Sequence, residues 1–384
     1  MKRVDAVVVG AGPAGSTAAY RLSRGGASVL LLDRARFPRD KPCGGGLTFR
    51  AVRELPFPVD PVVEDTVSCV ELGLGYRHRS VHRSSAPLVL MTQRRLLDAY
   101  LVEQAATAGA DFRDGVAVRE LAVEQDVARL TVDGEPVEAR VLIGADGANG
   151  STARSLGLEP YDYGVAFEAN ISYGSVPRER YAGRLVLELG AVPGGYAWVF
   201  PKGDHANVGV GGWRSGAPQL RRQLQRLCAE QGIPAHELKG ARGYRLPFRT
   251  RSSPLGRGRA LLVGDAAGLV DPLSGDGMYE AFVSSRLAAS AALGVLAGET
   301  DSLEAYRENL LQALGALHTY SWRAKHALDR FPRLTYEVVR RPFVWRAIEK
   351  LVRGELTSPA DARGVVRWPL KLVEAFGRAA TSAA

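Results

Sequence analysis

The first third of the chain alternates short apolar runs with glycine-rich polar turns. Residues 4–9 form an apolar run that ends at Gly10, and residues 28–32 form a second one that ends at Asp33. Short, mostly apolar runs of this length are typical of strands buried on both faces of a parallel sheet. The Ala- and Ser-rich segment 13–24 between them predicts a helix. Together these segments predict one βαβ unit of about thirty residues.

The pattern changes in the middle of the chain and again near its end. We expect a helix at 92–108 and buried or paired strands at 116–123, 127–132, 140–143 and 259–263, whereas the Gly-, Pro- and Arg-rich residues 34–60 predict a loop. Apolar and polar residues partly alternate, with a period of two, in segments 165–173, 184–189, 196–200 and 206–211. This alternation predicts an antiparallel sheet with one face free to cover a ligand. Beyond about residue 278 the pattern is mostly helical.

Composition limits the class of protein. The 384 residues are 46% hydrophobic and 24% charged, which is ordinary for globular proteins and excludes a mainly disordered or collagen-like chain. The three cysteines, without a CxxC pair, predict neither a disulfide framework nor a metal site, so a reducing, cytoplasmic setting fits best. No apolar run approaches the ~20 residues of a membrane-crossing helix, and no signal peptide is evident.

The positive charge is concentrated at the C-terminal end. Residues 320–384 hold 13 Lys/Arg and 6 Asp/Glu, a net +7 of the chain's +9, and no nucleic-acid motif accompanies them. Residues 342–353 predict a helix with Arg346, Lys350 and Arg353 on one face, and residues 365–378 again mix Trp, Leu and Phe with basic side chains. We expect peripheral contact with an anionic membrane and no nucleic-acid partner. A helical lid with a solvated basic face, or arginines that meet a substrate pyrophosphate, are the alternatives.

The first glycine-rich turn has the spacing of a dinucleotide site. Gly10-Ala11-Gly12-Pro13-Ala14-Gly15 follows the first predicted strand and opens the helix, and Asp33 ends the next strand. Glycines permit the tight turn and close approach of a pyrophosphate, and the helix N-terminus supplies N–H groups. Asp33 is suited to accept hydrogen bonds from a ribose diol. A glycine turn without a ligand is the alternative.

Two later segments also place an acid and glycines directly after an apolar run. They are Gly144-Ala145-Asp146-Gly147 and Gly264-Asp265-Ala266-Ala267-Gly268, the second followed by Gly275-Asp276-Gly277. Strand ends at one edge of a parallel sheet converge on one crevice. With the first turn, these segments resemble the flavoproteins of the p-hydroxybenzoate hydroxylase fold, over residues 1 to about 295.

This resemblance implies roles for single residues. Asp265 is expected to contact the ribityl chain of FAD, and Asp146 belongs to a motif associated with FAD and nicotinamide. Arg94 matches an arginine at a helix start that contacts the cofactor, with Arg95 as its rival. The usual pattern has Ser four residues after the acid, whereas Ser151 stands five after Asp146. The roles of Ser151 and the following Arg154 are therefore not carried over with the motif.

Three further motifs point to a narrower family. Phe37-Pro38-Arg39-Asp40-Lys41-Pro42-Cys43-Gly44-Gly45-Gly46-Leu47, Tyr196-Ala197-Trp198-Val199-Phe200-Pro201 and Asp271-Pro272-Leu273-Ser274-Gly275-Asp276-Gly277 resemble the geranylgeranyl reductase family of FAD-dependent oxidoreductases. Members of that family reduce double bonds in prenyl chains of archaeal lipids, chlorophyll or menaquinone. The implied FAD contacts are Gly10, Gly12, Pro13, Ala14, Gly15, Asp33, Arg34, Cys43, Gly44, Gly45, Arg94, Asp146, Gly264, Asp265, Gly275, Gly277 and Met278.

The residue chemistry agrees with a prenyl substrate. Tyr196, Trp198 and Phe200 stand at period two, so in a strand they share one face that suits a long apolar chain, unless they form an ordinary aromatic core layer. The expected substrate contacts are these three with Pro201, Gly45 and Gly46, and the expected catalytic residues are Cys43, Tyr196 and Trp198. For Cys43, a structural role as a buried filler and a functional role are equally expected, the functional role being that of a weak proton donor or a redox partner of the flavin.

The sequence therefore predicts hydride transfer from reduced FAD to an alkene carbon, with protonation of the other carbon by Cys43, Tyr196 or an ordered water. NADPH or a reduced ferredoxin, as a redox partner protein, would supply the electrons. An FAD-dependent monooxygenase of aromatic or polyketide substrates shares the flavin motifs. A flavin halogenase lacks support because no WxWxIP arrangement is present. A flavin-binding module without turnover is the third class.

The expected fold is α/β, in three parts. A discontinuous Rossmann-like FAD-binding domain would comprise residues 1–60, 92–158 and 255–300. An antiparallel-sheet substrate domain would comprise 61–91 and 159–254, and 301–384 would form a helical, basic C-terminal region.

Overall fold

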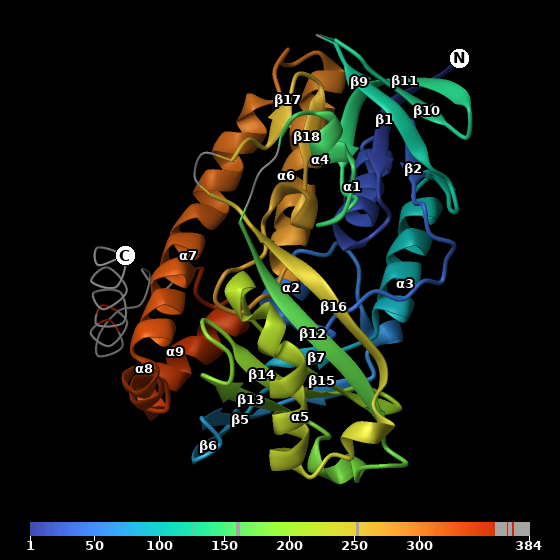
Figure 1. Cartoon of the computed structure of the whole chain (residues 1–384). Coiled ribbons are helices and arrows are strands. Elements are labelled where there is room, and N and C mark those ends of the chain that lie inside the picture. Colours follow the sequence, from blue (N-terminus) through green and yellow to red (C-terminus); the bar gives the residue numbers. More distant parts are fainter. Residues whose placement is uncertain (125, 159–161, 251–252, 358–366, 368–370, 372–384) are drawn as a thin grey trace.

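Two large sheets and a long helix that contacts both define the fold. The computed structural model describes residues 1–124, 126–158, 162–250, 253–357, 367 and 371. One sheet lies in the upper part of the molecule and the other in the lower part, and helix α7 (Glu304–Arg330) runs along the flank of both (Figure 1).

The first sheet is mainly parallel. Its strand order is β17-β18-β11-β1-β2-β8, with the antiparallel strands β10 and β9 added beside β11. The strands are β1 (Lys2–Val9), β2 (Val29–Leu32), β8 (Asp111–Arg113), β9 (Val118–Val123), β10 (Ala128–Val132), β11 (Glu135–Gly144), β17 (Gly256–Arg257) and β18 (Ala260–Leu262). The carboxyl ends of β1, β11 and β18 carry the three glycine-containing segments, so these segments meet at one edge of the sheet.

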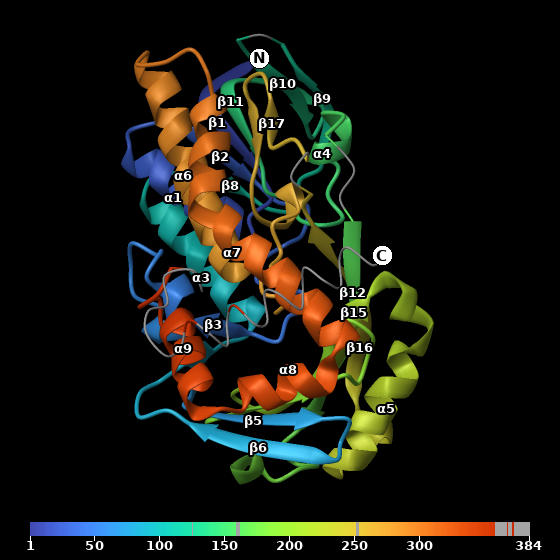
Figure 2. The same ribbon diagram turned by 90° about the vertical axis from the view of Figure 1, so that its left-hand side faces the viewer.

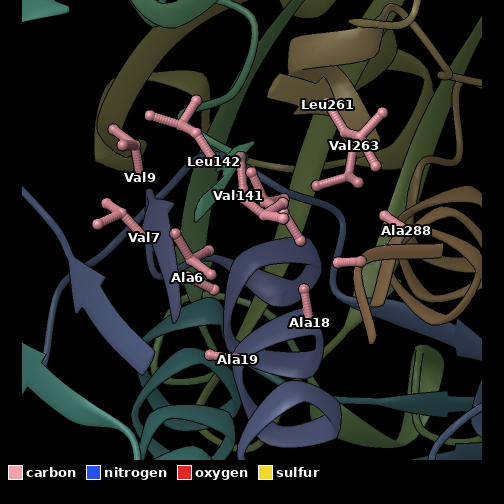
Figure 3. Packing of buried hydrophobic residues seen from close by; sticks show 14 of the residues in the cluster. Ala6, Val7, Val9, Ala18, Ala19, Val141, Leu142, Leu261, Val263 and Ala288 are labelled. Atoms are coloured by element: carbon pink, nitrogen blue, oxygen red, sulfur yellow. The ribbon is translucent and has the colours of Figure 1, made fainter. Parts of the chain in front are cut away.

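Helices α1 (Pro13–Arg24), α3 (Arg94–Thr107) and α6 (Met278–Ala297) pack with this sheet. Figure 3 shows Ala18, Ala19 and Ala288 of α1 and α6 facing the apolar side chains of β1, β11 and β18. These alanines let the helices approach the sheet closely. Helix α6 has the length and apolar composition of a membrane span, contrary to our expectation that no segment approaches it. Just over half of that span is buried inside the protein, as in a core helix.

The second sheet has the strand order β16-β12-β15-β14-β13-β5-β6. Its strands are β5 (Cys69–Leu74), β6 (His78–Arg83), β12 (Asp162–Ser172), β13 (Arg184–Leu189), β14 (Tyr196–Pro201), β15 (His205–Trp213) and β16 (Lys239–Phe248). All neighbours are antiparallel except β13 and β5. One face, which we call the outer face, packs Ala197, Val199 and Val208 against helix α5 (Leu220–Gln231).

The opposite, inner face is covered by two parts of the chain. Helix α8 (Pro332–Val339) lies beside β5, and helix α9 (Pro342–Val352) follows it (Figure 2). Tyr336 of α8 shares an apolar cluster with Leu72 and Leu74, and Trp345 of α9 shares one with Leu185. The side of the inner face that carries β14 and β12 meets the loop around Cys43. The inner face of this sheet is therefore where the site is assembled.

Short elements complete the described chain. A small sheet joins β3 (Gly46–Thr48), β7 (Val89–Met91) and β4 (Asp65–Val67), and the short helices are α2 (Phe49–Val52) and α4 (Thr152–Ser155). Single 3-10 turns are η1 (Asp60–Val62), η2 (Arg178–Arg180), η3 (Arg214–Gln219), η4 (Ala235–Glu237) and η5 (Gly264–Ala267).

Most predicted elements are confirmed, and the errors have physical causes. The βαβ unit, the helices at 92–108 and 342–353 and the period-two strands all form. The segment 34–60 is not all loop, because β3 and α2 form within it. Helix α5 was not expected, although Leu220, Leu224 and Leu227 stand at helical spacing and are buried. The helix expected at 365–378 lies outside the described residues, apart from positions 367 and 371.

A buried tyrosine hydroxyl of helix α7 forms a hydrogen bond to the first sheet, in addition to the apolar packing between them. Tyr306 is fully buried and donates its O–H to the Leu262 carbonyl at 2.7 Å. Because removal of the hydroxyl leaves that interaction unmade, Tyr306→Phe should lower the free energy of unfolding by about 1 kcal/mol. Urea unfolding checks this, with Tyr20→Phe as the control at a half-buried position. Equal stability of Tyr306→Phe and the unmodified protein would show that the bond does not anchor α7.

Candidate active site

The first glycine turn, residues 10–15, has no space for a Cβ atom at Gly10 or Gly15. Gly10 has φ +102°, and its N–H donates to the Leu32 carbonyl at 2.7 Å. A Cβ at position 15 would lie 1.7 Å from the Gly10 carbonyl oxygen. Helix α1 begins directly after Gly12 and has no side-chain cap. The turn therefore leaves helix N–H groups open toward a ligand, as a pyrophosphate site requires.

Two arginines face this turn, of which Arg94 is buried and Arg39 is partly exposed. A Cβ at Gly12 would lie 3.4 Å from Nη2 of Arg39 and 3.7 Å from Nη2 of Arg94. Asp98 holds Arg94 through two hydrogen bonds of 2.7 Å and pairs with Arg39 at 3.0 Å. Arg95, the rival candidate, is exposed, so the geometry favours Arg94. Arg39 has no role in the sequence prediction, and its contact with the turn is visible only in the folded chain.

The acid that ends β2 contacts the turn rather than solvent. Asp33 is 8% exposed and accepts hydrogen bonds from the N–H groups of Ala11 and Ala35, both at 2.9 Å. Arg39 lies 3.7 Å from the same carboxylate. Arg34, which follows Asp33, is exposed. Asp33 thus holds the turn in place, and its ribose contact stays a prediction.

Asp146 and Asp265 lie at the ends of neighbouring strands. Asp146 caps α4, because its Oδ2 accepts from the N–H groups of Ser151 and Thr152 and from the Thr152 hydroxyl. Its Oδ1 is buried without a hydrogen-bond partner in the described chain. Asp265 pairs with Lys41 at 3.0 Å. That pair links the third glycine segment to the loop that carries Cys43.

The loop 271–277 is held by its own side chains and by the second sheet. Asp271 accepts from the N–H groups of Leu273 and Ser274, and Asp276 accepts from the Met278 N–H at 2.9 Å. Tyr196 donates its hydroxyl proton to the Ser274 carbonyl. Burial raises the pKa of Tyr196, so its hydroxyl stays protonated and keeps this bond at neutral pH.

The loop with three glycines lies against the inner face of the second sheet. A Cβ at Gly44 would lie 2.7 Å from the Phe200 ring and 3.9 Å from Nε1 of Trp198. Cys43 donates its N–H to Glu168 at 2.9 Å, and Lys202 donates to the Cys43 carbonyl at 2.9 Å. Burial raises the pKa of Glu168, opposed by Lys202 and by that N–H. Neither Glu168 nor Lys202 is among the site residues predicted from the sequence.

The aromatic side chains of β14 share the inner face, as predicted. Register pairs Tyr196 with Gly211 and Trp198 with Gly209 on β15. A Cβ at Gly209 would lie 2.1 Å from the indole of Trp198, so the ring lies over this glycine. Trp198 also donates Nε1–H to Asn207 at 2.8 Å. The Trp198 ring is therefore held in place by its contact with Gly209 and its hydrogen bond to Asn207.

Tyr244 of β16 extends the inner face and was not predicted. Register places it in one row with Ala166, Gly211 and Tyr196. Its pKa is raised well above the ordinary value by burial, and the charges of Glu168 and Cys43 add to the shift. The phenol of Tyr244 therefore lies on the same face of the sheet as Tyr196 and Glu168. Of the remaining predicted residues, Pro201 is buried at the end of β14 and Met278 packs in the cluster around Leu47 and Phe282.

These features fit a dinucleotide flavin. An open helix N-terminus and two guanidinium groups converge on Gly12 and suit a pyrophosphate. Asp146 has an unpaired buried oxygen, and Asp265 stands beside it at the same sheet edge. No group of His, Cys, Asp and Glu that could hold a metal ion occurs among the described residues. We expect a flavin dinucleotide to bind along the three glycine segments, which meet at one edge of the first sheet.

Comparison with known proteins agrees with this geometry. The family model described as "FAD binding domain" matches residues 3–317. The chain is 30% identical to a chloroplastic geranylgeranyl diphosphate reductase of Oryza sativa subsp. japonica, over 89% of this chain and 78% of that protein. It is 35% identical to a menaquinone reductase of Mycobacterium tuberculosis, over 74% and 75% of the two chains. The chain therefore belongs to the geranylgeranyl reductase family of FAD-dependent oxidoreductases.

Solved structures confirm the fold. A geranylgeranyl bacteriochlorophyll reductase-like protein from Thermoplasma acidophilum has a TM-score of 0.78 at 24% identity, covering 88% of this chain and 91% of that one. A flavin-dependent brominase has a TM-score of 0.76 at 18% identity, covering 98% and 100%. The second likeness shows that this fold also serves other flavin chemistry. The predicted fold class, with the p-hydroxybenzoate hydroxylase-like architecture, is confirmed.

A buried carboxyl behind the loop 271–277 gives a test of the local electrostatics. Glu280 is fully buried, neither of its oxygens has a hydrogen-bond partner in the described chain, and His318 lies 3.8 Å away. Burial raises the pKa of Glu280 to about 7; His318 and Arg50 oppose the shift, whereas Asp276 and Asp271 add to it.

Because the folded protein holds this proton more tightly than the unfolded chain, stability should fall as pH rises from about 4.5 through 7. Glu280→Gln removes the titration, so at pH above 7 it should be more stable than the unmodified protein by up to about 3 kcal/mol, with little difference at low pH. Urea unfolding across this range measures the effect. Identical pH profiles of the two proteins would refute the assignment.

Proposed function

We propose that this protein reduces carbon–carbon double bonds of a prenyl chain by hydride transfer from reduced FAD and protonation. The observation that carries the proposal is the aromatic surface of β14, where Trp198 and Phe200 lie against the Cys43–Gly45 loop and Tyr196 holds the loop 271–277. The printed functions of the relatives, reduction of geranylgeranyl diphosphate and of menaquinone, support a substrate with a prenyl or quinone part.

The inner face continues the aromatic stripe with apolar side chains. Leu187 and Leu189 of β13 stand in register with Trp198 and Tyr196, and Leu185 lies on the same face of the strand. Helices α8 and α9 cover this part of the face. Aromatic and apolar side chains of this kind suit an unsaturated hydrocarbon better than a small polar molecule. We place one double bond of the prenyl chain at the aromatic stripe beside the Cys43 loop, because the leucines of β13 are already packed against α8 and α9.

FAD, when bound and reduced, supplies the hydride. The chain's own residues align the alkene, exclude water and provide the proton. Aromatic ring faces stabilise positive charge that develops on an isolated alkene, which has no carbonyl to accept electrons. Tyr196 already donates its proton to Ser274, so Cys43 is the better placed proton donor, and an ordered water is the remaining candidate. The electron donor in this proposal is NADPH or a reduced ferredoxin.

A single experiment separates this reaction from monooxygenation, which the likeness to a brominase keeps open as a flavin-oxygen alternative. The protein is purified with FAD, reduced with dithionite without oxygen, and mixed with geranylgeranyl diphosphate. The proposal predicts flavin reoxidation and a product heavier by two hydrogens for each bond. A product with one added oxygen that forms only in air would support the monooxygenase. Unchanged substrate across a panel of prenyl and quinone compounds would refute the reductase.

The C-terminal helices offer a route to a membrane-dissolved substrate. Leu334 of α8 and Phe343 of α9 are 39% and 37% exposed. Arg333, Arg341 and Arg346 lie exposed on or beside the same helices. Exposed apolar side chains among arginines suit the interface of an anionic lipid layer. We therefore propose a cytoplasmic protein that contacts the inner face of the cell membrane through α8 and α9.

Flotation with lipid vesicles tests the membrane contact. The protein should float with vesicles that contain phosphatidylglycerol and remain behind with pure phosphatidylcholine, because the attraction is partly electrostatic. Leu334→Ser with Phe343→Ser should abolish flotation, whereas Val81→Ser, at an exposed position of β6, should not. Absence of the unmodified protein from both vesicle fractions would remove the idea.

A further inference from the structure

The peptide groups of Cys43 are held from both sides by ionisable side chains of the second sheet. Its N–H donates to Glu168 of β12, and its carbonyl accepts from Lys202, which follows β14, each at 2.9 Å. Asp40, at the start of the loop, pairs with Arg242 of β16. The loop that faces the flavin therefore takes its position from the sheet that faces the substrate.

Both clamping side chains are out of reach of solvent. Glu168 is 2% exposed and Lys202 is 5% exposed. A Cβ at Gly45 would lie 3.0 Å from both Cε and Nζ of Lys202, so the ammonium group lies directly against the glycine backbone. Gly45 also donates its N–H toward the Cys43 sulfur at 3.4 Å. The two charges and the loop thus form one closely packed unit.

Stability alone does not explain this arrangement. Burial of an ionisable side chain costs desolvation that its hydrogen bonds barely offset, and apolar residues of similar volume stabilise a fold at least as well. A loop of three consecutive glycines has no side chains of its own to fix it and loses much conformational entropy on ordering. External hydrogen bonds to its backbone are the means by which such a loop keeps one position.

We propose that Glu168 and Lys202 are positioning residues that hold the Cys43–Gly45 backbone at the distance from flavin and alkene that hydride transfer needs. The inference rests on the proposed prenyl reduction. It differs from that proposal because neither residue is expected to touch the reacting atoms. Glu168 acts as an acceptor for the Cys43 N–H, so an amide oxygen at the same place should serve as well.

The test compares Glu168→Ala, Lys202→Met and Glu168→Gln in the FAD-loaded protein. The matched control is Glu188→Ala on the neighbouring strand β13. Glu188 is also 2% exposed and also accepts one backbone N–H, from Tyr76 at 2.6 Å, but its register partner Ala197 belongs to the outer face. The control thus removes the same kind of buried carboxyl without touching the Cys43 loop.

Two readouts are followed beside FAD affinity and melting temperature. The first is the rate of hydride transfer to geranylgeranyl diphosphate after anaerobic reduction. Glu168→Ala and Lys202→Met should slow it by about tenfold to 100-fold with KM unchanged. Glu168→Gln and Glu188→Ala should keep most of the rate. The second readout is alkylation of Cys43 by iodoacetamide, followed by peptide mass spectrometry, since Cys69 and Cys228 are buried. Alkylation should accelerate severalfold in Glu168→Ala and Lys202→Met only.

The two readouts separate failure of this inference from failure of the proposed function. If the unmodified protein reduces no prenyl probe, the alkylation rates still show whether Glu168 and Lys202 hold the Cys43–Gly45 loop in place. Unchanged transfer and alkylation in Glu168→Ala and Lys202→Met would overturn the inference. An equal loss in Glu188→Ala would also overturn it, because the effect would then be general destabilisation. A loss in Glu168→Gln as large as in Glu168→Ala would overturn the role assigned to Glu168, because the amide oxygen can still accept from the Cys43 N–H.

Discussion

The contact between the Cys43–Gly45 backbone and the inner face of the second sheet is the constraint on which the site depends. Glycines let the backbone approach a planar ring and the Phe200 ring, but they leave the loop without anchors. The sheet supplies them through Glu168 and Lys202, and Tyr196 holds the loop 271–277 in the same way. One face of this sheet therefore holds both loops that border the proposed flavin site.

The rest of the architecture keeps that face in register with the first sheet. Helix α7 binds the first sheet through Tyr306 and contacts the second through Lys325, which donates to the Gly194 carbonyl, and through Trp322, which stacks on Trp213. The glycine turn, the arginines at Gly12 and the acids after β11 and β18 lie at one edge of the first sheet. A hydride donor and an alkene bound in this space would thus be aligned by two sheets and a shared helix.

Much of this could be predicted from the sequence because the relevant signals are local. The GxGxxG turn, the acids after apolar runs and the period of Tyr196, Trp198 and Phe200 each fall within a few residues. Glu168 and Lys202 gave no such signal, since they meet Cys43 across 125 and 159 residues of chain. Arg39 lay inside a recognised motif, yet only folding brings it to Gly12. The helical spacing of α5 was readable and was overlooked within a strand-rich region.

The decisive measurement is a crystal structure of the protein with FAD and a non-reducible prenyl analogue. We expect the flavin ring to contact the backbone of Cys43–Gly45. We also expect the analogue to lie across Trp198 and Phe200, with the hydrogen bonds of Glu168 and Lys202 to Cys43 retained. A flavin ring remote from this loop, or an analogue bound away from the inner face, would show that the site is assembled differently.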